Sequence, residues 1–209
     1  MKNNSTNQQG AKTTKGEPQS SKKQKVYTKF QYKDQVFMVG DVCRFYNEQR
    51  DLIGKILQIA STDQNHKDFG KLKVQWYYYK SDLNFKKLGI SEKDQAQICD
   101  QELFPTTHTD LVYVQSLNGK CNIVTLDEFE QLKAANNDTF FTRADFDIHR
   151  KILKPSFDKW PKICSCQRPT NPQQFYICCD YCENWYHPEC QNSTAVGDNF
   201  KCDQCTMGD

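Results

Sequence analysis

The stretch CDYCENWYHPEC, Cys179–Cys190, decides how the C-terminal part of this 209-residue chain folds. Two cysteines are separated by two residues, a Trp-Tyr-His triplet follows, and a third cysteine ends the stretch. Cysteines in such a pattern can ligate a metal, pair in disulfides, form a redox couple or supply a catalytic thiol. Eight of the 11 cysteines crowd between Cys164 and Cys205, so the surrounding sequence has to decide between these roles.

The possible metal ligands come in short pairs with regular spacing. In chain order they are Cys164-x-Cys166, Cys179-x2-Cys182, His187-x2-Cys190 and Cys202-x2-Cys205. Seven cysteines and one histidine fill two tetrahedral zinc sites completely. Using Cys178 in place of Cys179 would create a C-x3-C loop, so we expect Cys179 to be the ligand and Cys178 to lie on a strand. Few aliphatic side chains accompany these ligands, and the sequence therefore predicts two Zn²⁺ ions whose binding is coupled to folding.

The competing roles of the cysteines meet physical objections. Disulfides need an oxidising compartment, and the N-terminal MKNNSTNQQGAKTTKG has no apolar segment typical of a secretory signal. A thioredoxin-like pair needs a βαβ context, and a catalytic cysteine needs a thiolate that is free of metal. The chain has no Gly-rich phosphate loop, no nucleophile–base motif and no zinc pattern with an open position, so we expect no enzymatic activity.

The ligand order of four cysteines, one histidine and three cysteines resembles that of the PHD finger, as do the Trp185-Tyr186-His187 triplet and the Cys-Asp at the third ligand. A RING finger, and with it a ubiquitin-ligase-like function, would place the histidine fourth rather than fifth. The resemblance covers about residues 162–206 and implies two cross-braced zinc ions. It assigns Cys164, Cys166, His187 and Cys190 to one ion, and Cys179, Cys182, Cys202 and Cys205 to the other.

PHD fingers that bind methylated lysine enclose its ammonium group with aromatic side chains. The positions that correspond to this cage are Ile163, Thr170, Tyr176 and Trp185. The resemblance implies binding of the histone H3 N-terminal tail, with the methylated lysine as its fourth residue. Asp180 and Glu183 could receive an arginine or a free amine of that tail. The alternatives are that Tyr176 and Trp185 only pack the finger and that both acids are merely solvated.

The segment before the finger has a β-rich pattern. Apolar and aromatic runs at 52–59 and 71–79 predict strands, Asn118-Gly119 predicts the turn of a hairpin within 110–124, and 126–135 has helical spacing. Many short strands and few helices indicate a mainly β barrel or sandwich.

The motifs of this segment are VGDV at Val39–Val42, LIGKILQI at Leu52–Ile59, WYYYK at Trp76–Lys80, ELF at Glu102–Phe104 and FFTRADFD at Phe140–Asp147. Together they resemble the BAH domain over about residues 26–155, with FFTRADFD fitting its final strand. A BAH domain followed by a PHD finger resembles the small plant-type chromatin readers of methylated histone H3. Their BAH aromatic cage corresponds to Trp76, Tyr78 and Leu52. The alternative is that Trp76 and Tyr78 pack the barrel and the domain is a protein-interaction scaffold.

The charge distribution divides the chain. Residues 1–25 have six lysines and one glutamate, whereas 160–209 have three basic and six acidic residues. We therefore predict a disordered basic tail at 1–25, a BAH domain at 26–155 and the finger at 156–209, with its core at 162–206. The linker KPSFDKWPKI is short and offers Phe157 and Trp160 for burial, so we expect the two domains to pack together.

These observations predict a non-enzymatic nuclear reader of histone tails. The basic run SKKQK at Ser21–Lys25 fits a nuclear import signal, although a solvated tail is the alternative. The acidic finger suits a basic peptide, and direct nucleic-acid binding is not expected beyond the tail. No run of apolar residues is long enough to span a membrane. The alternative function is a structural subunit that binds only other proteins of a chromatin complex.

Overall fold

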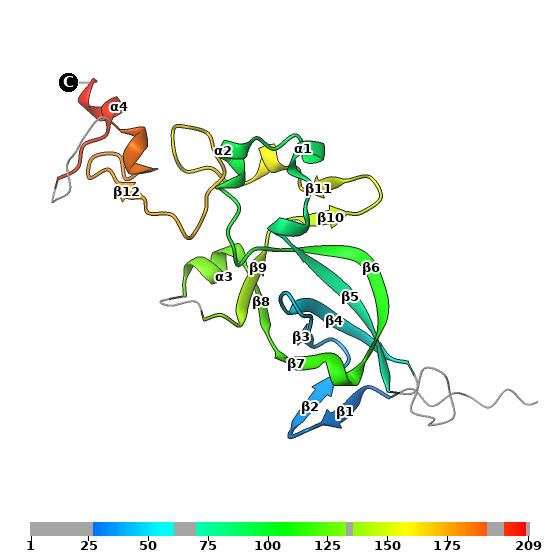
Figure 1. Ribbon diagram of the computed structural model, residues 1–209. Coiled ribbons are helices and arrows are strands. Elements are labelled where there is room, and N and C mark those ends of the chain that lie inside the picture. Colours follow the sequence, from blue (N-terminus) through cyan, green and yellow to red (C-terminus); the bar gives the residue numbers. More distant parts are fainter. Residues whose placement is uncertain (1–26, 61–69, 133–135, 192–198, 208–209) are drawn as a thin grey trace, which may run out of the picture.

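The computed structural model describes residues 27–60, 70–132, 136–191 and 199–207 (Figure 1). The predicted tail at 1–25 and residues 133–135 of the predicted helix lie outside these ranges. The described residues form a mainly β domain followed by a small cysteine-rich finger. The finger lies at the opposite end of the molecule from the first hairpin, as Figure 1 shows. None of the described helices has the length and apolar character needed to cross a membrane.

An antiparallel sheet of five strands forms the body of the first domain. Its order is β6-β5-β4-β3-β7, with bounds Leu103–Tyr113, Lys71–Tyr79, Leu52–Ile59, Val42–Phe45 and Leu117–Lys120. In β5 the side chains of Leu72, Val74 and Trp76 are buried, while Lys73 between them is exposed. This alternation places one face of the strand on the core. The strands predicted at 52–59 and 71–79 are confirmed.

Two hairpins and one parallel pair complete the β structure of the first domain. β1 (Lys29–Tyr32) pairs with β2 (Gln35–Met38), and β10 (Asp145–Asp147) pairs with β11 (Ile152–Lys154). β8 (Asn122–Thr125) runs parallel to β9 (Thr139–Thr142). The mainly β architecture predicted from the sequence is therefore confirmed.

The hairpin predicted at Asn118-Gly119 is wrong. Both residues lie inside β7, which pairs with β3, and the strand that follows pairs with β9 instead. The positive φ of Gly119, +104°, serves a β-bulge: the paired residues Leu117 and Lys120 enclose two residues of β7, but their partners on β3 enclose only one. The sequence signal for positive φ holds at Gly119 but not at Asn118, and its use in a turn was wrong.

The predicted last strand and the predicted helix also differ from the structure. Residues 140–147 contribute to two short strands, β9 and β10, and β11 follows them. The helix α3 ends early, at Leu126–Glu130, although its N-terminus has the expected acidic residues. Thr125 caps it by accepting from the backbone N–H of Glu128, whose side chain accepts from the N–H of Thr125 in return.

A second apolar cluster lies beside the sheet, where the short helices α1 (Phe85–Leu88) and α2 (Glu92–Gln95) meet the β10–β11 hairpin (Figure 1). Phe104 from β6 and Trp160 from the linker are both buried there and stack with their ring centroids 6.3 Å apart. The linker thus takes part in the core of the first domain, and Phe157 packs against the same cluster.

The finger has little regular structure. Its described elements are the two-residue strands β12 (Ile177–Cys178) and β13 (Trp185–Tyr186), a 3-10 turn at Pro188–Cys190 and the short helix α4 (Asp203–Thr206). The buried apolar residues are three cysteines with Tyr186 and Phe200, and the partly buried ones around them are mostly cysteines too. Sulfur atoms therefore occupy the interior that aliphatic side chains fill in the first domain.

Candidate functional site

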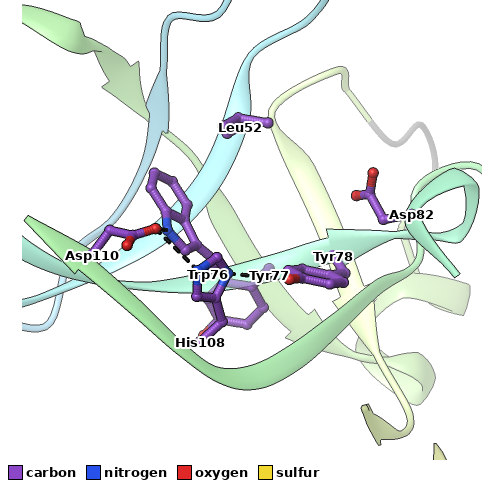
Figure 2. Close-up of a pocket in the computed structure, with 7 residues that line it drawn as sticks. All are labelled: Leu52, Trp76, Tyr77, Tyr78, Asp82, His108 and Asp110. Carbon is purple, nitrogen blue, oxygen red and sulfur yellow. Dashed lines mark hydrogen bonds and ion pairs between the residues drawn. The ribbon is translucent and has the colours of Figure 1, made fainter. Parts of the chain in front are cut away.

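A cavity of about 410 Å³ opens beside the middle of the sheet (Figure 2). Trp76 and Tyr78 line it from β5, and Leu52 lines it from the first position of β4. These are the three positions that the sequence predicts for a BAH cage, and the structure brings them together. Tyr77, Asp82, His108 and Asp110 complete the lining.

A chain of two hydrogen bonds and one ion pair holds Trp76 and Tyr78 in place in this pocket, called the aromatic pocket below. The hydroxyl of Tyr78 lies 3.1 Å from Nδ1 of His108, and Nε2 of His108 lies 3.1 Å from Oδ2 of Asp110. The indole Nε1–H of Trp76 donates to the same carboxylate oxygen over 2.7 Å. Figure 2 shows this chain running along one side of the pocket. Rotation of either ring would break a hydrogen bond, so the pocket is pre-formed.

Gly54 on β4 allows Trp76 to lie flat against the sheet. The two residues are paired between β4 and β5, and a Cβ at Gly54 would come within 2.2 Å of Cγ1 of Val74 and 3.0 Å of Cε3 of Trp76. Phe45 packs edge-on against the indole, with ring centroids 5.4 Å apart. Trp76 therefore has a packing role as well as a place in the pocket wall, and the two roles are compatible.

Two carboxylates line the pocket. Asp110 and Asp82 contribute carboxylates, and burial together with these two acids raises the pKa of the Tyr78 hydroxyl, which stays neutral. Arg50 pairs with Asp82 from outside the lining. Aromatic faces beside carboxylates attract an organic cation, since both provide negative electrostatic potential. His108 and Asp110 were not predicted as site residues, because alternating polar residues on an edge strand resemble any solvent-exposed pattern.

The predicted metal ligands form two clusters in the finger. In each cluster the ligand atoms lie within 4.8 Å of one another. The first consists of Cys164, Cys166, His187 and Cys190, and the second consists of Cys179, Cys182, Cys202 and Cys205. This grouping is the cross-braced one that the resemblance implies, and either cluster could hold a metal ion. Cys178 lies on β12, outside both clusters.

The acid–base properties of the thiols suit a cation. Burial by itself raises the pKa of Cys164, but the backbone N–H groups of Cys166 and His187 outweigh burial and bring the pKa down to about 6. The pKa of Cys179 is lowered to about 6 in the same way, by backbone N–H groups that include that of Cys202. Burial and the neighbouring sulfur atoms raise the pKa of Cys190 to about 12. A divalent cation would relieve this repulsion and allow all ligands to ionise.

The four cage positions predicted on the finger are not equivalent. Ile163 and Trp185 are exposed, at 42% and 48% of their surface. Thr170 is buried, and its hydroxyl donates to the carbonyl of Pro161. Tyr176 is half-buried, its ring lies 4.6 Å from that of His187, and its hydroxyl accepts from the backbone N–H of Asn171. The structure therefore leaves two of the four side chains open to solvent.

The two acids predicted to contact a histone tail are both exposed. Asp180 and Glu183 stand near the turn between β12 and β13, and Glu183 adopts a positive φ of 57°. Both residues are close in sequence to Trp185, which begins β13.

Arg143 joins the finger to the first domain. It forms a buried, two-pronged ion pair with Glu102, at 2.7 and 2.8 Å. The same guanidinium donates to the carbonyls of Thr170 in the finger and Gln97 in the first domain, and it lies 4.0 Å from the ring centroid of Trp160. The two domains pack together, as the short linker predicts.

Several known proteins are similar to this chain. The chain is similar to the chromatin remodeling proteins SHL and EBS of Arabidopsis thaliana, with 28% identity over 140 residues and 23% over 158 residues. The matches cover 65% and 74% of this chain, and the chain spans 58% and 64% of the length of these relatives. The yeast Rsc2 BAH domain aligns with a TM-score of 0.44 and 16% identity, covering 61% of this chain and 53% of that one. The family model of the BAH domain matches residues 28–156, and the chain therefore belongs to the BAH domain family.

Proposed function

We propose that this protein binds histone tails at chromatin and that the aromatic pocket receives the cation of a methylated lysine. The observation that carries the proposal is the pre-formed pocket in which Trp76 and Tyr78 lie beside Asp110. The relatives SHL and EBS are chromatin remodeling proteins by name, which supports a role at chromatin and in the nucleus. The proposed role is recognition, without enzymatic activity.

The chemistry of a methylated ammonium group suits this pocket. Methylation keeps the positive charge of lysine and weakens its hydration, so transfer from water onto aromatic faces becomes easier. The indole and the phenol supply two such faces, and Leu52 supplies an apolar wall instead of a third ring. Asp110 contributes the opposite charge. A cavity of about 410 Å³ has room for the methylated group together with part of its side chain.

For the finger we propose two structural Zn²⁺ ions and binding of the histone H3 N-terminal tail. Thiolate and imidazole ligands in two sets of four fit tetrahedral zinc. When bound, each ion would hold distant segments of the finger together. Trp185 offers the exposed aromatic face for the lysine that is the fourth residue of the tail, and Asp180 and Glu183 offer negative charge.

A peptide-binding experiment tests the role of the aromatic pocket. The intact protein is screened against modified histone peptides, and the best methylated and unmethylated peptides are titrated against wild type, Tyr78→Leu and Asp110→Asn. We expect Tyr78→Leu to lower the affinity for the methylated peptide by about tenfold, because one cation–π face is lost. The matched control is Tyr113→Leu, on the same sheet but outside the pocket, where the side chain is 58% exposed.

The titrations distinguish histone binding at the aromatic pocket from the structural-subunit function. Equal affinities of wild type and Tyr78→Leu for the methylated peptide would exclude the pocket as the binding site. Failure of every histone peptide to bind would favour the structural-subunit function, in which the domains contact only other proteins.

A further inference from the structure

The two cysteine clusters differ in the polar groups around them. In the first cluster these groups contact His187. Its Nδ1 faces the sulfur atoms of Cys166 and Cys190, at 3.5 and 3.8 Å, whereas its Nε2 lies 3.1 Å from Oε1 of Gln174. A metal ion between the thiolates would therefore take Nδ1. Nε2 then carries the proton, and this N–H donates a hydrogen bond to Oε1 of Gln174. Such outer partners fix the ring orientation of a metal-binding histidine.

Gln174 also contacts the first domain. Its Nε2 donates to the carbonyl of Ala96, which directly follows α2, over 3.4 Å. The amide of Gln174 thus has its acceptor side on the metal ligand and its donor side on the neighbouring domain. One planar group spans the boundary between the two.

A second series of contacts also links His187 to the carbonyl of Ala96. The ring of Tyr176 packs on the imidazole, and the Tyr176 hydroxyl accepts from the backbone N–H of Asn171. The Asn171 side chain then donates to the carbonyl of Ala96 over 2.8 Å. The ring packing and hydrogen bonds that orient the histidine therefore converge on one acceptor in the first domain.

Among the described residues, the polar partners of the second cluster lie within the finger. Sγ of Cys182 lies near the hydroxyl of Tyr186 and the side-chain amide of Asn184, and Sγ of Cys179 accepts from the backbone N–H of Cys202. A metal ion in this cluster would organise the finger alone.

We infer that metal binding in the first cluster and docking of the finger on the BAH domain are thermodynamically coupled through Gln174, and that Gln174 does not couple the second cluster to docking. The inference rests on the metal sites proposed above. Gln174 acts as a positioning residue: its acceptor side orients His187 toward the ion, and its donor side bonds the carbonyl of Ala96. By reciprocity, docking raises the metal affinity of the first cluster, and the metal stabilises the docked domain.

The test uses the full chain loaded with ¹¹³Cd²⁺, whose NMR resonances distinguish the first cluster, which includes a histidine, from the second, which has only thiolates. A chelator titration measures how firmly each cluster holds its ion in wild type and in Gln174→Leu. We expect Gln174→Leu to weaken metal binding in the first cluster roughly tenfold, the lower range for loss of an outer partner, and to leave the second cluster unchanged. Equal weakening of both clusters, or of neither, would overturn the inference.

Two further variants separate the contact to His187 from the contacts to the first domain. Gln173→Leu is the matched control, because Gln173 accepts from the backbone N–H of Asp100 across the same boundary without touching His187. It should leave metal binding in the first cluster intact. Gln174→Glu keeps the acceptor for Nε2–H and loses the donor to Ala96. It should retain the metal yet reduce the rise in unfolding temperature that metal gives the BAH domain, and an unchanged rise would contradict the coupling.

Discussion

The BAH domain and the finger bury different kinds of side chain, and the kind of buried side chain decides what each domain needs in order to fold. The first domain buries large apolar side chains such as Phe45, Phe104, Phe141 and Ile53 in clusters on and beside the sheet. The finger buries cysteines around two aromatic rings. Apolar burial acts in water without any partner, whereas thiols crowded together gain stability only through a cation. We therefore expect the first domain to fold unaided and the finger to depend on metal.

The largest effect should follow from removing a metal ligand. Cys182→Ala should unfold the finger and leave the BAH domain folded, because binding energies of structural zinc amount to about 10–16 kcal/mol and the sheet has its own core. Metal analysis of the wild type should give two zinc ions per chain. NMR spectra of the variant should lose the dispersed signals of the finger and keep those of the sheet. A finger that remains ordered in excess chelator would remove the distinction between the two domains.

Breaking the buried ion pair should be next in size. Arg143→Met leaves the carboxylate of Glu102 buried without a partner, which should cost about 3–5 kcal/mol of unfolding free energy. Burial raises the pKa of Glu102, so the folded state binds a proton there more readily than the unfolded state. The loss should therefore be smaller in acid and grow as the pH rises through the carboxyl range. Denaturant unfolding at several pH values measures both effects.

Two controls sharpen this experiment. Lys159→Met removes a cation that is 73% exposed and should change the stability little. The double variant Glu102→Gln, Arg143→Met removes the uncompensated charge and should recover part of the loss. A double variant as unstable as Arg143→Met would show that the guanidinium acts through its contacts to the Thr170 and Gln97 carbonyls rather than through Glu102.

A smaller loss should follow from Gly54→Ala, which tests the packing under the aromatic pocket. The added methyl group would collide with Val74 and press on Trp76, and overpacking of this kind costs about 1–3 kcal/mol. Thermal unfolding measures the loss, with Gln58→Ala on the exposed side of the same strand as the control. Unchanged stability together with unchanged peptide binding would mean that Trp76 moves freely, against the pre-formed pocket.

The smallest effect concerns the finger surface. Trp185→Ala should remove most of the preference of the finger for a methylated H3 peptide, about 1–2 kcal/mol or roughly five- to thirtyfold in affinity. The zinc content should not change, because Trp185 lies in neither cysteine cluster. Titrations with methylated and unmethylated peptides, against wild type and this variant, measure the preference. Equal affinities of the wild type for both peptides would mean that the indole only packs the finger.

The sequence predicts well what depends on local pattern or spacing. The strands at 52–59 and 71–79 follow from alternating apolar residues, and the two cysteine clusters form from the spacing of their pairs. It predicts poorly what depends on distant partners. Asn118-Gly119 signals positive φ without saying whether a turn or a bulge uses it. Arg143 finds Glu102 across 41 positions, and the polar chain from His108 to Trp76 exists only once β5 and β6 are paired.

The junction at Arg143 fixes the distance between the aromatic pocket and Trp185. The aromatic pocket and Trp185 belong to domains that are held by hydrogen bonds at Thr170, Asn171 and Gln174. A tail that reaches both places gains from a high effective concentration only if its two recognised residues match that separation, since a rigid pair of sites cannot adapt to the ligand. The junction would then select ligands by the spacing between two modified residues, along one tail or between two neighbouring tails.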